Sequence, residues 1–146
     1  MHGLDVHHVS LIVSDLDRAL AFYQRAFGLD RVERPPITVP GIWLACGLIQ
    51  LHLIENRDGS FRQKPEIDTA DWHFAFRTDD FDATLARLEA AGFSEDPDED
   101  GVRRLFVNRH GRAGFPQLYL LDPDNNIIEV NGAPTAQPPL WQPPST

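Results

Sequence analysis

The chain has 146 residues, 42% of them hydrophobic, which fits one globular domain or two small modules that share a core. Its 13 basic and 22 acidic residues give a net charge of −9, which argues against nucleic acid and anionic membranes as partners. There is no membrane-length apolar run and no signal-peptide pattern, and the single cysteine cannot form an internal disulfide, so we expect a cytoplasmic protein.

The first predicted elements are a strand and a helix. Residues 6–13 alternate between an apolar face and a face that carries His8. Ser14 is the predicted N-cap of the helix that follows, and Gly28 is its predicted end. The apolar face of the strand is therefore expected to pack under this helix.

Further strands follow before the pattern starts again. Prolines favour an irregular or edge segment after the helix, and residues 43–55 predict a hairpin around Gly47. Residues 56–71 are polar and read as a long loop. A second strand then places Trp72 with two phenylalanines on one face and His73 on the other, and a second helix follows.

The two halves of the sequence repeat each other. The segment HVSLIVSDLDRAL, which starts at His8, aligns with HFAFRTDDFDATL, which starts at His73. Such a repeat predicts two βαβββ units around one core. We therefore expect a single α+β domain over residues 1–146, with module one at about 4–56, module two at about 70–132 and a proline-rich tail at 133–146.

The last predicted hairpin carries an acidic residue in a strand. Residues 122–126, with the sequence DPDNN, predict a tight turn, and the β-branched run IIEV after it predicts a strand. Alternation places Ile128 and Val130 on the core side and Glu129 on the opposite side.

Opposite the apolar faces, the predicted strands collect polar side chains with metal-binding atoms: His8, Gln50, His52, His73 and Glu129. The repeat pairs His8 with His73, and aligning LIQLH with IIEVN pairs Gln50 with Glu129. Two imidazoles and a carboxylate with open positions suit Fe or Mn, and a fourth ligand suits Zn, Ni or Mg as well. We therefore expect a divalent metal as cofactor.

The segments HHVSLIVSDLDRALAFYQRAFGL and DPDNNIIEVNG resemble the opening and closing motifs of the vicinal oxygen chelate superfamily, which includes glyoxalases, bleomycin-resistance proteins and extradiol dioxygenases. This resemblance covers residues 4–132. It implies two βαβββ modules that form a half-barrel sheet with helices on its outer face. It also implies a divalent metal held by His8, His73 and Glu129.

The resemblance places any fourth ligand on the strand IQLHLIE. Gln50 matches the corresponding position of glyoxalase I and methylmalonyl-CoA epimerase, and the alignment with Glu129 favours it. His52 is the second choice, or a substrate contact. For catalysis, the resemblance implies a metal-side Glu as base, here Glu129, and His52 is a candidate second base because its ordinary pKa lies near working pH.

Several further residues are candidates for substrate binding. A basic stretch supplies Arg104, Arg109 and Arg112, and Arg is suited to binding carboxylate or phosphate. The alternative is a basic surface loop that balances the neighbouring acidic run. Tyr119 and Gln117 share one face of their strand and are candidate pocket residues.

Three functions compete on this scaffold. The first is a metal-dependent lyase or isomerase of glyoxalase, epimerase or thiol-transferase type, acting on a small oxygenated, anionic molecule. The second is an Fe(II) extradiol-type dioxygenase, with His52 and Tyr119 as acid–base candidates. The third is a metal-free binding protein of bleomycin-resistance type, which has no need of the metal-binding set. Exposed sheet edges favour a homodimer, with modules paired within a chain or swapped between chains.

Overall fold

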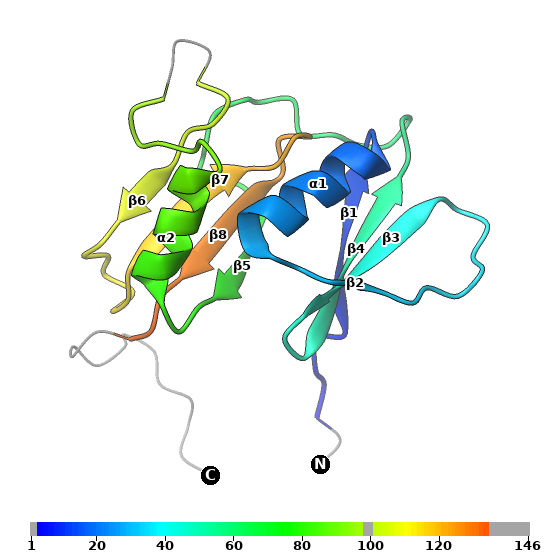
Figure 1. Ribbon diagram of the computed structural model, residues 1–146, viewed down its shortest axis with the longest axis horizontal. Helices are drawn as coiled ribbons and strands as arrows, with labels where there is room; N and C mark the ends of the chain where they lie inside the picture. The colour runs from blue at the N-terminus through cyan, green and yellow to red at the C-terminus, as the bar shows by residue number, and fades with distance from the viewer. Residues whose placement is uncertain (1–2, 98–100, 135–146) are drawn as a thin grey trace. The chain divides into compact units, whose positions relative to one another are not determined.

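The computed structural model describes residues 3–97 and 101–134. The chain divides into two compact units: Met1–Lys64 with Asp122–Asn126, and Pro65–Leu121 with Ile127–Thr146. Each unit contains one four-stranded mixed sheet and one helix (Figure 1). The predicted proline-rich tail lies outside the described residues from residue 135 onward.

Unit 1 is a βαβββ module. Its elements are β1 (His8–Val13), α1 (Leu16–Phe27), β2 (Arg31–Val32), β3 (Gly41–Cys46) and β4 (Ile49–Glu55). The strand order is β1-β4-β3-β2, with β1 parallel to β4 and the other pairs antiparallel. The short β2 is an edge strand, as the prolines after it predict, and Gly47 with a φ of 57° makes the β3–β4 turn.

Helix α1 begins one residue later than the sequence predicts. Asp15, not Ser14, is the N-cap, because its side chain accepts a hydrogen bond from the Arg18 backbone N–H at 2.8 Å. The Ser14 hydroxyl instead donates to Asp124. Gly28 ends the helix in the left-handed region at φ 67°, as predicted.

The sheet of unit 1 has one apolar and one polar face. Helix α1 packs on β4 and β3, and the buried apolar side chains of the sheet are Leu11, Val13, Ile42, Leu44, Leu51 and Leu53. By strand alternation and register, His8, Gln50 and His52 share the opposite face. Burial of the apolar face therefore fixes which side of the sheet carries the histidines.

Unit 2 repeats this arrangement. Its elements are β5 (His73–Arg77), α2 (Phe81–Ala90), β6 (Phe106–Asn108), β7 (Gln117–Leu121) and β8 (Ile127–Asn131). The order β5-β8-β7-β6 and the parallel β5–β8 pair match those of unit 1. The N-cap of α2 is Asp80, which stands at the same step of the sequence repeat as Asp15.

In unit 2 the apolar residues on the helix side of β7 and β8 are buried as predicted, and Tyr119, Ile127 and Glu129 on the opposite face are buried as well. Helix α2 buries Phe81, Leu85 and Leu88, and the sheet buries Leu118, Leu120, Ile128 and Val130. Trp72 was expected on the apolar face of the second strand, but β5 begins only at His73 and the Trp72 side chain is 55% exposed. Outside the sheet, its position no longer follows the strand alternation.

The DPDNN turn between β7 and β8 belongs to unit 1. Asp122 is buried and accepts a hydrogen bond from the Tyr23 hydroxyl at 2.9 Å and from the Asn126 side chain at 2.8 Å. Asp124 forms an ion pair with Arg18 at 3.1 Å. Asn125 adopts φ 65°, which Asn tolerates, so the turn forms without the glycine usual at such positions.

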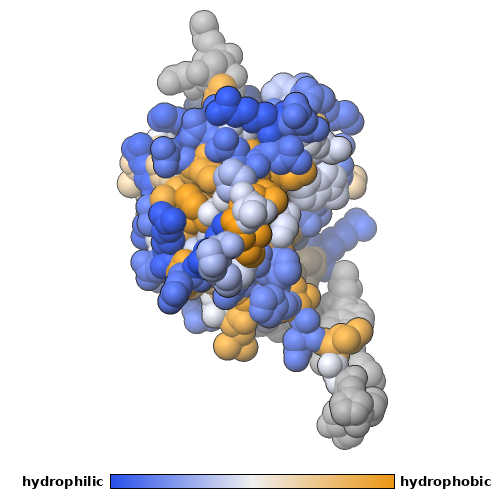
Figure 2. All heavy atoms as spheres, turned by 90° about the vertical axis from the view of Figure 1, so that its right-hand side faces the viewer, coloured by the Kyte–Doolittle hydropathy of each residue, from blue (hydrophilic) through white to orange (hydrophobic). Residues whose placement is uncertain are grey.

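The predicted α+β fold with two βαβββ modules is confirmed. None of the helices in the described part of the chain is long and apolar enough to cross a membrane. Unit 1 exposes several large apolar side chains, namely Leu4, Val6, Ile37, Val39 and Leu48. On the face that Figure 2 shows, hydrophobic side chains gather in the middle of a largely hydrophilic surface.

Candidate metal centre

Unit 2 brings two of the predicted ligands together. The Nε2 atom of His73, at the start of β5, lies 2.9 Å from Oε2 of Glu129 in β8. The parallel register aligns Ala75 with Glu129, which puts the imidazole and the carboxylate on the same sheet face. Only 6% of Glu129 is exposed.

The hydrogen bond of Nδ1 in His73 determines which of the two ring nitrogens carries the proton in the neutral ring. Its Nδ1 atom lies 2.8 Å from the backbone oxygen of Asp71, and a carbonyl oxygen can only accept, so Nδ1 carries a proton. In the neutral imidazole, Nε2 then presents a lone pair to the Glu129 carboxylate. The Nε2 lone pair and the carboxylate oxygen repel each other at 2.9 Å unless a cation lies between them or the ring carries a proton on Nε2. A histidine with Nδ1–H bound to a backbone carbonyl is also the usual form of a metal-ligating histidine, so this pair fits a divalent cation.

Two β7 side chains hold the other side of the carboxylate. Nε2 of Gln117 donates to Oε1 of Glu129 at 2.6 Å and to the hydroxyl of Tyr119 at 3.2 Å. Burial, followed by the nearby Glu129 charge and a hydrogen bond to it, raises the pKa of Tyr119 to about 12. Tyr119 is therefore a protonated phenol that can donate a hydrogen bond at neutral pH.

In unit 1, three aromatic rings stack in a row. The His52 ring lies between the Trp43 indole, with centroids 4.2 Å apart and planes at 5°, and the His8 imidazole, at 4.1 Å and 12°. Nε2 of His52 lies 2.8 Å from Oε1 of Gln50. The stack fixes the plane of the His52 ring, and the contact with Gln50 fixes the orientation of the ring within that plane.

His52 is held in its neutral form. Burial, followed by the charges of His8, His7 and Arg34, lowers the pKa of His52 below its ordinary value. A neutral imidazole has a free lone pair on one nitrogen. His52 can therefore act as a metal ligand or as a base.

The strand register changes the expected equivalence of Gln50 and Glu129. Glu129 pairs with Ala75 on one side and Tyr119 on the other. In unit 1, the residue that pairs with Ser10, the repeat counterpart of Ala75, is His52, and its other partner is Trp43. His52, not Gln50, is thus the register counterpart of Glu129, although Gln50 lies on the same face.

The predicted metal ligands are distributed over both units. His8, Gln50 and His52 belong to unit 1, and His73 and Glu129 belong to unit 2. Within residues 3–97 and 101–134, no three His, Cys, Asp or Glu side chains are gathered closely enough to hold a metal ion.

The predicted substrate-binding arginines differ in their surroundings. Arg109 forms an ion pair with Asp82 of α2 at 3.0 Å, and both side chains are exposed. Arg112 lies exposed in the loop before β7. Arg104 lines a cavity of unit 2, together with residues of the 65–67 segment.

Two residues that position the candidate ligands, Trp43 and Asp71, were not among the predicted site residues. Trp43 stacks on His52, and its place opposite that residue in a predicted hairpin was the available signal. Asp71 acts through its backbone oxygen, so its side-chain identity carries no signal.

The comparison with protein families agrees with this fold. The model of the Glyoxalase/Bleomycin resistance protein/Dioxygenase superfamily matches residues 5–130. The chain therefore belongs to this superfamily, and the resemblance seen in the sequence is confirmed.

Three relatives illustrate the range of similar proteins. The chain is 28% identical over 132 residues to Glyoxylase I 4 of Arabidopsis thaliana, a match covering 89% of this chain and 71% of that protein. It is 28% identical over 147 residues to Metallothiol transferase FosB of Shouchella clausii, covering 90% and 82%. The crystal structure of Lactoylglutathione lyase from Agrobacterium tumefaciens superposes with a TM-score of 0.61 at 26% identity, covering 90% of this chain and 96% of that one.

Proposed function

We propose that the protein is a divalent-metal-dependent enzyme of glyoxalase, epimerase or thiol-transferase type that acts on a small, oxygenated, anionic substrate. The observation that carries this proposal is the His73–Glu129 pair, in which the Asp71 carbonyl holds Nδ1 of His73 and leaves Nε2 to face the carboxylate. The names of the relatives, a glyoxylase, a metallothiol transferase and a lactoylglutathione lyase, support the same class of chemistry.

The metal ligands in this proposal are His8, His73 and Glu129, the set that the family resemblance implies. The fourth is His52 or Gln50, and the register argument favours His52. A bound divalent ion would polarise substrate oxygens and acidify an adjacent C–H bond or a water. This donor set lacks thiolates and combines imidazoles with a carboxylate, which suits Zn, Ni, Mn, Fe or Mg.

The residues of the chain supply positioning and proton transfer around such an ion. Gln117 holds the Glu129 carboxylate in one orientation. Tyr119, a protonated phenol at neutral pH, hydrogen-bonds to Glu129 and helps Gln117 to orient that carboxylate. If Gln50 is the fourth ligand, His52, whose pKa burial lowers, serves as a second proton acceptor in addition to Glu129.

The proposal is tested by the metal content of the purified protein. Wild type, the double variant His73→Ala/Glu129→Gln and the control His110→Ala are purified without added metal, reconstituted with Zn, Mn, Ni, Fe(II) or Mg, and assayed by elemental analysis. His110 is an exposed histidine of the same unit. We expect one divalent ion per chain in wild type and control and none in the double variant. A wild type that binds none of these metals would overturn the proposal and favour a metal-free binding protein.

A homodimer and a cytoplasmic location stay predictions. Each sheet, taken by itself, ends in edge strands, β1 and β2 in unit 1 and β5 and β6 in unit 2. Edge strands and exposed apolar side chains are features that association covers. Sedimentation equilibrium of the full chain measures the oligomeric state directly, and a monomer at micromolar concentration would contradict the prediction.

A further inference from the structure

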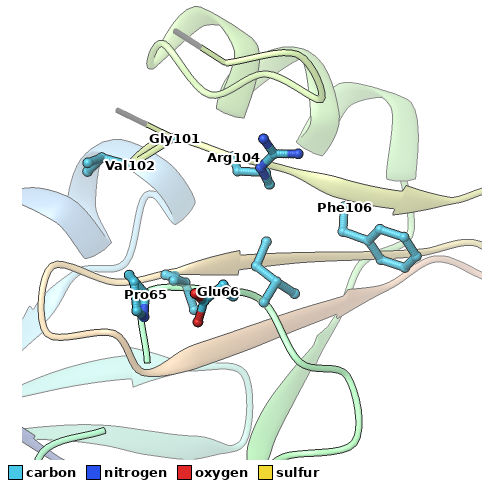
Figure 3. Close-up of a pocket in the computed structure, with 8 residues that line it drawn as sticks. Pro65, Glu66, Gly101, Val102, Arg104 and Phe106 are labelled. Atoms are coloured by element: carbon cyan, nitrogen blue, oxygen red, sulfur yellow. The ribbon is translucent and has the colours of Figure 1, made fainter. Parts of the chain in front are cut away.

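Unit 2 contains a cavity of about 500 Å³, which we call the Arg104 pocket (Figure 3). It is lined by three segments that are distant in the sequence: the linker before β5, the segment that leads into β6, and the end of β7. The lining residues are Pro65, Glu66, Ile67, Gly101, Val102, Arg104, Phe106 and Leu121. Most of this lining is apolar, with a single cationic side chain.

The pocket lies on the same sheet face as the candidate metal ligands of unit 2. Phe106 pairs with Tyr119, and Tyr119 pairs with Glu129, so these three side chains form one row across the sheet. Leu121 pairs with Ile127, which pairs with His73, in the neighbouring row. The pocket residues Phe106 and Leu121 therefore continue the surface that begins at His73 and Glu129.

Ring contacts confirm that this surface is continuous. The centroids of His73 and Tyr119 are 5.7 Å apart, and those of Tyr119 and Phe106 are 6.1 Å apart. Phe106 is 48% exposed, although it lies beside buried Tyr119. An exposed aromatic ring at this position offers apolar contact to a ligand that extends from Glu129 toward Arg104.

The strand spacing gives the length of such a ligand. Neighbouring strands lie about 4.8 Å apart, so the distance from β8, which carries Glu129, to β6, which carries Phe106, is about 10 Å. A three-carbon oxygenated compound cannot span this distance. A molecule that contacts both Glu129 and the Arg104 pocket needs an extended middle part.

The charge of the pocket indicates the end group. Within the described residues, Arg104 makes no side-chain hydrogen bond or ion pair, whereas Arg109 is paired with Asp82. Glu66 already has a partner. In a chain with a net charge of −9, Arg104 thus remains available to bind an anionic group.

We infer that the Arg104 pocket binds the far end of the substrate, and that the substrate is an elongated organic anion. Its oxygenated head lies at the candidate metal centre, its apolar middle lies along Tyr119 and Phe106, and its terminal carboxylate or phosphate lies against Arg104. This inference rests on the proposed function for the head group alone. The apolar lining and the Arg104 guanidinium, which has no side-chain partner within the described residues, support the rest of the inference.

The test uses ligands that differ in length and in end group. The zinc- or manganese-loaded full-length protein is titrated by calorimetry with malate, α-hydroxydecanoate and α-hydroxydecanedioate, which share the head group. We expect the long diacid to bind most tightly. The analogue with a terminal phosphonate in place of the second carboxylate is titrated in the same way. Tighter binding of this analogue than of the diacid would indicate a phosphate end group, and weaker binding a carboxylate.

Arg104→Gln is the decisive variant, and Arg103→Gln is its matched control. Arg103 carries the same charge one residue away, but its side chain lies against Gly92 and outside the pocket lining. Arg104→Gln should lower the ratio of monoacid to diacid dissociation constants by about tenfold, because hydrogen bonds to charged groups are strong. Arg103→Gln should keep that preference. Circular dichroism and the thermal midpoint verify that both variants fold.

Octanoate and octanol, titrated into the metal-free protein, separate this inference from the proposed function. We expect octanoate to bind more tightly than octanol in wild type and Arg103→Gln, but not in Arg104→Gln. If octanoate binding depends on Arg104 but the protein binds no metal, the proposed function is overturned while the Arg104 pocket still stands as an anion-binding site. Metal binding with equal affinity for malate and the long diacid, or with an unchanged preference in Arg104→Gln, would overturn the pocket inference alone.

Discussion

Gln117 directs its Nε2 atom at Oε1 of Glu129 across a distance of 2.6 Å, while Oε2 of the same carboxylate faces His73. One oxygen is therefore held by the protein, and the other remains directed at the candidate metal position. Because its two oxygens have different partners, the Glu129 carboxylate can be held in one orientation and still offer an oxygen to a metal ion.

Replacing Gln117 should weaken metal binding without removing any ligand. In Gln117→Leu the carboxylate of Glu129 loses the donor that orients it, and losses of this kind lower metal affinity by about ten- to a hundredfold. Competition with a chromophoric chelator measures the zinc affinity. Gln63→Leu, an exposed glutamine of unit 1, is the control. An unchanged affinity in Gln117→Leu would show that Glu129 needs no such support.

The identity of the fourth ligand can be tested by two substitutions that keep the local packing. His52→Phe retains a flat ring between Trp43 and His8, and Gln50→Met retains a side chain of similar length. If His52 is the ligand, its loss should reduce zinc affinity by more than the loss of its hydrogen-bond partner, for which we expect about tenfold. A larger loss in Gln50→Met would instead assign Gln50, as the sequence alignment favours.

The buried Asp122 should make stability depend on pH. Burial raises the pKa of Asp122 above its ordinary value, although hydrogen bonds from Asn126, Tyr23 and the Asp124 backbone oppose the shift. The folded state therefore binds this proton more tightly than the unfolded state. The resulting stabilisation is complete below the ordinary Asp pKa of about 4 and is lost as the pH rises through the folded pKa.

Asp122→Asn removes this titration. We expect the free energy of unfolding of wild type minus that of Asp122→Asn to be larger near pH 4 than at neutral pH, as measured by urea denaturation. Asp58→Asn, at an exposed position of the same unit, controls for the change of charge alone. A difference that stays constant or grows with rising pH would contradict the assigned direction of the shift.

The two helix N-caps should contribute equally. Asp15 and Asp80 each accept a backbone hydrogen bond from the third helical residue, at 2.8 and 2.9 Å. Replacement of either by Ala should cost about 1 kcal/mol of unfolding free energy. Asp17→Ala, which changes an exposed acid in the first turn of α1 without removing a cap, should cost only a few tenths of a kcal/mol, roughly the weak dipole effect. Equal costs for Asp15→Ala and Asp17→Ala would show that the cap bond itself contributes little.

The sequence determined the repeat, the order of the elements and the face on which each strand residue lies. It did so because alternation has a period of two and because Leu11, Leu53, Ile128 and similar side chains must be buried. The predicted sharing of one face by His8, Gln50 and His52, and of another by His73 and Glu129, followed from this alternation.

Only the tertiary structure decided the register and the pocket. A shift of a strand by two residues leaves every side chain on the same face, so alternation cannot distinguish Gln50 from His52 as the counterpart of Glu129. The hydrogen-bond ladder distinguishes them, because it aligns His52 with Ser10 and Glu129 with Ala75. The Arg104 pocket likewise depends on three segments brought together by chain topology, so no local pattern could have revealed which arginine lines it.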